Sequence, residues 1–202
     1  RELEITRLAT GVDRTHHLDD DALARTLDTL GRFRRTWEDH GVTPEHVRIA
    51  ATSAVRDAED RDRFFTGVRE RTGVDATVLT GEEEAATAYR GVRHGLHAPL
   101  PFAVLDIGGG STELIVGGRN GEVAASHSLQ LGSVRLTERC LHGDPPGHAE
   151  IAAAGAEIHR NLEELDERLA VRGVHVIEAA TLVGVAGTVT TLAALDARVD
   201  EY

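Results

Sequence analysis

The stretch AVLDIGGGSTELIVGG (Ala103–Gly118) decides the fold of this chain. A short apolar run ends at Asp106, three glycines follow, and residues with high β-propensity resume at Thr112. This order predicts a strand, a tight glycine-rich turn and a second strand.

The turn of this hairpin has the composition of an anion-binding loop. Gly108, Gly109 and Gly110 lack the Cβ atoms that would keep a ligand away from the backbone. Their N–H groups can point into one concavity and bind an anion, and Ser111 adds a hydroxyl. Carboxylates flank the turn at Asp106 and Glu113, and hard oxygen ligands suit a phosphate chain with Mg²⁺. The alternative is that the glycines serve the turn alone.

The composition limits the class of protein. The 202 residues carry a net charge of -12, which argues against a general affinity for nucleic acids or anionic membranes. All 22 basic residues are arginine, which we interpret as codon bias. No apolar run is long enough for a membrane helix, and no signal-peptide pattern begins the sequence. The single cysteine, Cys140, excludes an internal disulfide and fits a cytoplasmic protein.

Helical and strand-like segments alternate along the chain, which predicts an α/β fold. Helices are expected at 18–40, 60–72, 82–92, 137–141, 150–169 and 189–197. In addition to the hairpin, strands are expected at 47–52, 76–79, 123–131 and 181–185. A further strand is expected within 1–15, before a turn at Gly11. A linker with Gly95, Pro99 and Pro101 predicts an N-terminal lobe (1–97), a C-terminal lobe (98–202) and a ligand site in the cleft between them.

Three adjacent carboxylates, Glu82–Glu84, open the helix expected at 82–92. Thr80 and Glu83 fit a capping box, and acidic residues in a first turn complement the helix dipole, so a structural role explains them. The functional alternative is that mutual repulsion raises one pKa and lets that glutamate accept a proton from an attacking water.

Two further segments have features that suit phosphate. Arg56 follows the strand expected at 47–52, and its guanidinium could bind phosphate with two hydrogen bonds or form an ordinary surface ion pair. The stretch GVAGTVTTL (184–192) predicts a second glycine-bearing turn from strand to helix, a place where anions bind. It matches neither a Rossmann fingerprint nor a P-loop. The eleven histidines show no zinc-ligand spacing, and no serine-hydrolase elbow is present.

These segments together resemble the exopolyphosphatase and guanosine pentaphosphate phosphohydrolase (Ppx/GppA) family, within the actin-like, Hsp70-like ATPase superfamily. The resemblance covers most of the chain, runs in the family order, and is strongest to the shorter, two-domain actinobacterial members. It rests on ATSAVRDAEDRDRFF (51–65), VLTGEEEAATAYRGV (78–92), LDIGGGSTELIVG (105–117), LGSVRLTERCLHGDPP (131–146) and GVAGTVTTLAAL (184–195).

The resemblance implies an actin-like (RNase H-like) two-lobe α/β fold, incomplete in this chain, and a role for several residues. Glu84 matches the general base that activates water. Asp106 and Glu113 match carboxylates near Mg²⁺, and the segment Gly108–Ser111 matches a phosphate-binding loop. Arg56 matches an arginine directed at the substrate phosphates.

Gly187 and Thr188 match the glycine turn that contacts nucleotide or phosphate in related ATPases. The sequence also departs from the family pattern. A first phosphate loop of the kind D-x-G-[ST]-N-S-x-R is expected before Arg1, and the second lobe is expected to continue past Tyr202. The chain lacks methionine, so we expect it to be part of a longer protein. Asp60 stands where the family usually has asparagine, which would weaken a phosphate contact or cap the following helix.

The resemblance implies a Mg²⁺-dependent, exopolyphosphatase-type hydrolase in the cytoplasm that releases terminal phosphate from inorganic polyphosphate, and it suggests a homodimer. Guanosine pentaphosphate (pppGpp) is the alternative substrate, and the aromatic content of 3% favours polyphosphate because a nucleoside pocket needs apolar or aromatic walls. Two other functions remain open: a sensor that binds polyphosphate or the alarmone without turnover, and an actin- or Hsp70-like ATPase that acts through partners.

Overall fold

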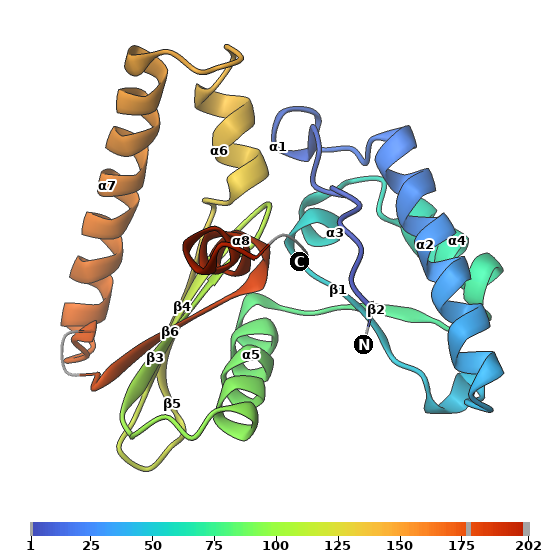
Figure 1. Cartoon of the computed structure of the whole chain (residues 1–202), viewed down its shortest axis with the longest axis horizontal. Helices are drawn as coiled ribbons and strands as arrows, with labels where there is room; N and C mark the ends of the chain where they lie inside the picture. The colour runs from blue at the N-terminus through green and yellow to red at the C-terminus, as the bar shows by residue number, and fades with distance from the viewer. Residues whose placement is uncertain (1, 177–178, 200–202) are drawn as a thin grey trace. The chain divides into compact units, whose positions relative to one another are not determined.

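The computed structural model describes residues 2–176 and 179–199. It contains two compact units, Arg1–Thr80 and Gly81–Tyr202, which are described separately below (Figure 1). No helix within the described residues is both long and apolar enough to cross a membrane.

The first unit is mainly helical around a two-stranded parallel sheet. Its elements are α1 (Val12–Thr15), α2 (Asp20–Asp39), the 3₁₀ helix η1 (Pro44–His46), β1 (Ile49–Ala51), α3 (Ser53–Asp57), α4 (Asp62–Thr72) and β2 (Ala76–Val78). The expected helices and strands at 18–40, 47–52, 60–72 and 76–79 are confirmed within a few residues. The strand expected within 1–15 is wrong, because residues 2–7 pair with no strand and α1 follows the turn at Gly11.

One apolar cluster holds the first unit together. Val55 on α3 and Val68 on α4 are almost completely buried, and Leu23 of α2 packs into the same cluster. The start of α2 is fixed by its N-cap, since the Asp19 carboxylate accepts a hydrogen bond from the Ala22 N–H at 2.9 Å. Leu23 and Leu27 recur at helical spacing on the face of α2 that packs on this core, as the sequence predicted.

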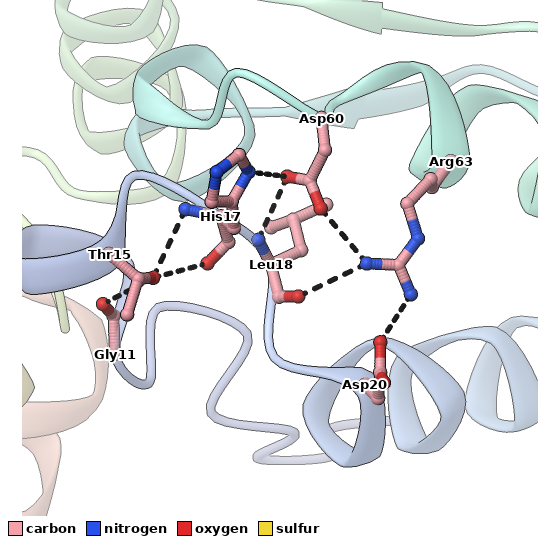
Figure 2. Close-up of polar contacts among 7 residues, drawn as sticks. All are labelled: Gly11, Thr15, His17, Leu18, Asp20, Asp60 and Arg63. Carbon is pink, nitrogen blue, oxygen red and sulfur yellow. Dashed lines mark hydrogen bonds and ion pairs between the residues drawn. The ribbon is translucent and has the colours of Figure 1, made fainter.

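Asp60 joins the segment before α2 to the segment before α4 (Figure 2). Its carboxylate accepts hydrogen bonds from the Leu18 N–H at 2.9 Å and from Arg63 at 2.9 Å, and His17 Nδ1 lies 3.7 Å away. Arg63 also forms an ion pair with Asp20 in the first turn of α2. Asp60 thus links two segments of the first unit. It does not cap the following helix, as the sequence suggested, because the N-cap of α4 is Arg61 and no side chain caps it. The weaker phosphate contact stays a prediction.

The second unit is a four-stranded sheet with helices on both faces (Figure 1). Its elements are α5 (Gly81–Gly95), β3 (Phe102–Ile107), β4 (Thr112–Gly117), β5 (Val123–Leu129), α6 (Ser133–Cys140), α7 (His148–Val171), β6 (Thr181–Val185) and α8 (Ala186–Ala197). The strand order is β5-β4-β3-β6, in which β3 is antiparallel to β4 and parallel to β6. All the elements expected in this region are confirmed, including the hairpin that the sequence placed at its centre.

The two faces of this sheet carry separate apolar clusters. Ile115 of β4 packs on one face with Tyr89 of α5, while Leu114 packs on the other face with Leu165 and Leu169 of α7. Tyr89 stacks on Phe102 with ring centroids 4.6 Å apart. Successive side chains of β4 point to opposite faces of the sheet, and all of them are buried. Burial on both faces explains why the sequence of β4 is nearly continuously apolar.

The boundary between the two compact units lies before α5 and not after it. Because α5 packs against β3, β4 and β5, the second unit begins at Gly81. The sequence placed a boundary between lobes 1–97 and 98–202, at the opposite end of α5. That lobe division stays a prediction, and these contacts assign α5 to the unit that carries the hairpin.

We expect Asp60→Ala to lower the free energy of unfolding by about 1–3 kcal/mol, because the Leu18 N–H and Arg63 lose their acceptor. Asp60→Asn keeps an oxygen for Leu18 and loses the negative charge, so its effect should be smaller. Urea unfolding at pH 7 measures both.

The Asp60 charge also predicts a pH dependence. Burial opposes its ionisation, but hydrogen bonds from Leu18 and Arg63 outweigh burial and lower the pKa of Asp60 below its ordinary value of 3.8. An acid with a lowered folded-state pKa stabilises the fold above its unfolded-state pKa and loses that contribution as the pH falls through the folded-state pKa. The stability gap between wild type and Asp60→Asn should therefore narrow below pH 4, and a gap that does not change with pH would contradict this assignment.

Candidate functional site

Most of the predicted site residues meet at one end of the second unit's sheet. β3 and β6 are parallel, and Asp106 near the end of β3 pairs with Val185 at the end of β6. The β3–β4 turn lies at this end, and α8 begins there directly after β6. We call this edge the loop end of the sheet. Ligands commonly bind at the carboxyl ends of the parallel strands of such sheets.

The glycine turn of the hairpin leaves backbone donors available. The Gly108 N–H donates to the Ser111 carbonyl at 3.0 Å and closes the turn. Within the described residues, the N–H groups of Gly109, Gly110 and Ser111 donate no hydrogen bond. Three consecutive N–H groups without an acceptor are what a phosphate oxygen needs.

The carbonyl oxygens of the same turn are held by the start of α6. Gly108 O accepts from the Ser133 N–H, and Gly109 O accepts from both Val134 and Arg135 N–H groups, at 3.0 to 3.1 Å. The Arg135 side chain is buried, and its Nε donates to Gly110 O at 2.7 Å. These bonds fix the backbone of the turn and use N–H groups of α6 that have no partner inside the helix.

Gly132 makes this contact sterically possible. A Cβ atom at this position would overlap the Gly109 carbonyl and lie 2.6 Å from Gly110 N. The neighbouring atoms are backbone, so they cannot move aside as a flexible side chain would. Glycine is therefore required where α6 meets the turn.

Asp106 and Glu113 form a facing pair across the two strands of the hairpin. They are register partners, so their side chains share one face of the sheet, the face that α5 covers. Glu113 is only 2% exposed, and Ser128 Oγ donates to its Oε1 at 2.7 Å. Burial and the neighbouring Glu113 raise the pKa of Asp106. In residues 2–176 and 179–199, neither carboxylate has an ion-pair partner.

Two facing carboxylates, one of them buried, suit a divalent metal ion. Burying the charge of Glu113 is costly unless that charge is paired, and a cation between the two carboxylates would pair it. The described residues contain no cluster of three or more His, Cys, Asp or Glu side chains that could enclose a metal. Mg²⁺ commonly takes only one or two carboxylates and completes its shell with water and phosphate oxygens, which matches Asp106 and Glu113.

Glu84 lies in the first turn of α5, over the same face of the sheet. Gly81, the first residue of α5, lies beside Ser128, since a Cβ on Gly81 would be 3.6 Å from the Ser128 Cβ. Ser128 in turn bonds Glu113. Of the three glutamates, Glu84 is the partly buried one, whereas Glu82 and Glu83 are exposed. The structure thus brings the helix turn of Glu84 to the carboxylate pair.

Gly187 and Thr188 lie in the first turn of α8, at the loop end. The chain enters this helix through Ala186, which has a positive φ of 67°. Such a conformation is strained for alanine and is often found at functional sites. The N-terminal ends of α5, α6 and α8 therefore all lie at the loop end, where their dipoles favour an anion.

Arg56 belongs to the first unit, and its phosphate role stays a prediction. It lies on α3, and its Nη1 donates to the Leu79 carbonyl at 3.0 Å.

Sequence reasoning gave no role to Gly132, Ser128 or Arg135. All three act through contacts with residues 15 to 25 positions away. Local patterns do not reveal contacts of this kind.

The whole chain is similar to proteins of one family. Residues 1–201 match the family model described as the Ppx/GppA phosphatase family. The chain is 43% identical to "Exopolyphosphatase 2" of Mycobacterium tuberculosis, an alignment that covers 100% of this chain and 62% of that protein. It is 39% identical to "Guanosine-5'-triphosphate,3'-diphosphate pyrophosphatase" of Vibrio vulnificus, over 65% of this chain and 26% of that protein.

The fold is also that of solved structures of this family. A crystal structure titled as an exopolyphosphatase-like protein superimposes with a TM-score of 0.87 at 37% identity, over 100% of this chain and 62% of that one. The expected α/β class is confirmed, and the fold is shared with this solved structure. The chain thus spans about three fifths of the length of these full-coverage matches. From its family match and its fold, the chain belongs to the Ppx/GppA phosphatase family.

Proposed function

We propose that this chain carries the phosphate-binding and catalytic part of a Mg²⁺-dependent phosphohydrolase that releases the terminal phosphate of inorganic polyphosphate. One observation carries the proposal: two facing carboxylates, the partly buried Asp106 and the buried Glu113, have no ion-pair partner among the described residues and lie beside a turn with three available N–H donors. The activity of the relative from Mycobacterium tuberculosis, as its name gives it, is in line with this function.

Each group of site residues has a separate role in the proposed reaction. The N–H groups of Gly109, Gly110 and Ser111 bind oxygens of the terminal phosphate, and the dipole of α8 at Gly187 and Thr188 adds positive potential. Asp106 and Glu113 hold Mg²⁺, which when bound neutralises charge that develops on the phosphate oxygens. Glu84 orients the attacking water and accepts its proton. The role of Arg56 in binding substrate phosphates is proposed from the family resemblance alone.

Polyphosphate is the preferred substrate and pppGpp the alternative. A guanine base needs an apolar or aromatic surface, yet in the described part of the second unit the aromatic side chains Tyr89 and Phe102 stack on each other in the core. The name of the Vibrio vulnificus relative keeps pppGpp as the alternative. A cytoplasmic location and a homodimer remain proposals from the sequence, as does the absence of nucleic-acid and membrane partners.

Glu84→Gln in the full-length protein should reduce phosphate release by about 100-fold or more, because the amide cannot accept the proton. Release is measured with Mg²⁺ from short polyphosphate, long polyphosphate and pppGpp. Glu82→Gln is the matched control, since Glu82 is an exposed carboxylate in the same helix turn. Equal release from Glu84→Gln and wild type would remove Glu84 from the mechanism, and bound ligand without release by wild type would favour the sensor function.

Asp106→Asn should make the metal-free protein more stable at pH 7. Because burial and Glu113 raise the pKa of Asp106, the fold is more stable while Asp106 is protonated and loses this stability as the pH rises through the folded-state pKa. The neutral amide mimics the protonated acid. Thermal unfolding in EDTA should show a higher Tm for Asp106→Asn, and added Mg²⁺ should stabilise wild type but not the variant. Equal stabilisation of both proteins by Mg²⁺ would exclude Asp106 as a metal ligand.

Gly132→Ala should move α6 away from the glycine turn. We expect it to lower both the rate of phosphate release and the free energy of unfolding. The added methyl overlaps backbone, and such overpacking costs about 1–3 kcal/mol. Gly155→Ala is the control, because Gly155 lies in α7 with no atom within 4 Å of the added Cβ. Urea unfolding and phosphate release measure both variants, and a Gly132→Ala protein with wild-type values would show that the turn does not depend on this contact.

A further inference from the structure

A cluster of two arginines and one histidine lies on the other face of the same sheet. A cavity of about 290 Å³ lies between β5 and the C-terminal end of α7, lined by Ser126, His127, Arg168, Leu169, Val171 and Arg172. His127 pairs with Leu114, whose side chain packs on the α7 face. Asp106 and Glu113 occupy the opposite face, so this cavity is separate from the candidate active site.

The cavity concentrates positive charge without a carboxylate to balance it. Arg168 in the last turn of α7 and Arg172 at its C-cap are four residues apart, a spacing at which like charges destabilise a helix. Arg168 Nη1 donates a hydrogen bond to His127 Nε2 at 3.1 Å. No ion pair is present for either arginine among residues 2–176 and 179–199, and none of the six lining residues is acidic.

The electrostatics of His127 agree with this arrangement. Its pKa is lowered by burial first, and then by the positive charges of Arg168 and Arg172. The two guanidinium groups therefore act on the same point in the cavity, where an anion would be attracted by both positive charges.

We propose that His127, Arg168 and Arg172 form a second phosphate-binding site, outside the catalytic centre. Arg168 gives one N–H to His127 Nε2, and the two guanidinium groups still offer more N–H donors than the two oxygens of one carboxylate match, whereas a tetrahedral phosphate presents more oxygens. The phosphate has two possible sources, free orthophosphate or one unit of a polyphosphate chain. The binding step does not depend on the proposed hydrolysis.

The position of the site predicts a moderate affinity for phosphate. Arg168 is in the last turn of α7, where the helix dipole places about half a negative charge that offsets part of the positive potential. Arg168 and Arg172 are exposed to solvent, so binding should weaken as salt rises. The buried Leu169 lies in the wall of the cavity, and the exposed Val171 lies at its edge.

Nuclear magnetic resonance of the His127 imidazole and arginine Nε–H groups tests the proposal. The full-length protein with Glu84→Gln is used without Mg²⁺, so that no chain is hydrolysed during the experiment. Orthophosphate and tripolyphosphate are titrated separately, with NaCl added to keep the ionic strength constant. The double variant Arg168→Gln/Arg172→Gln removes the cluster, and Arg119→Gln, in the β4–β5 turn, is the control for loss of one exposed charge.

We expect saturable shifts at His127 that the double variant weakens by about 10-fold or more and that Arg119→Gln leaves unchanged. Saturation by orthophosphate identifies free phosphate as a ligand, and saturation by tripolyphosphate alone identifies the chain. Shifts that NaCl alone reproduces, or that persist in the double variant, would overturn the proposal. The Glu84 assay is independent of these readouts, so a failure here and a failure of the proposed hydrolysis are distinguishable.

Discussion

The close approach of α6 to the glycine turn is the constraint on which the candidate site depends. Gly132 lets the two backbones meet, and the N–H groups at the start of α6 then hold the carbonyl oxygens of Gly108 and Gly109. With its carbonyls held on one side, the turn keeps the N–H groups of Gly109, Gly110 and Ser111 available for an anion. Arg135 adds a buried guanidinium to the same backbone. A rigid anion site needs such support, because three glycines alone would be costly to order.

The two faces of the sheet in the second unit carry groups of opposite charge. On the α5 face, the partly buried Asp106 faces the buried Glu113, and a bound metal ion, as proposed above, would offset the cost of burying the Glu113 charge. The N-terminal ends of three helices point their positive dipoles toward the same end of the sheet. In the proposed function, local donors and a metal ion would let this acidic chain bind a polyanion, although its overall charge opposes binding. On the α7 face, the cationic cluster around His127 has the opposite character.

The sequence predicted the second unit well because its signals are local. Alternating and continuous apolar runs defined β3, β4 and β5, and the glycine triplet defined the turn between the first two. Asp106 and Glu113 were recognised as a pair because they flank the turn symmetrically, and antiparallel pairing makes such residues register partners. The first strand expected within 1–15 was wrong, because apolar residues such as Leu3 and Ile5 alternate in the sequence but lie exposed with no strand beside them.

The sequence by itself determined the α/β class, the hairpin, and the positions of most helices and strands. Only the tertiary structure decided that α5 belongs to the unit of the hairpin, that Ser128 bonds Glu113, and that Gly132 must be glycine. It also decided that His127 meets Arg168 across 41 positions of the chain. The reason is physical: propensity and periodicity act over one or two turns of chain, whereas these contacts depend on how sheet register and helix packing bring distant backbones together.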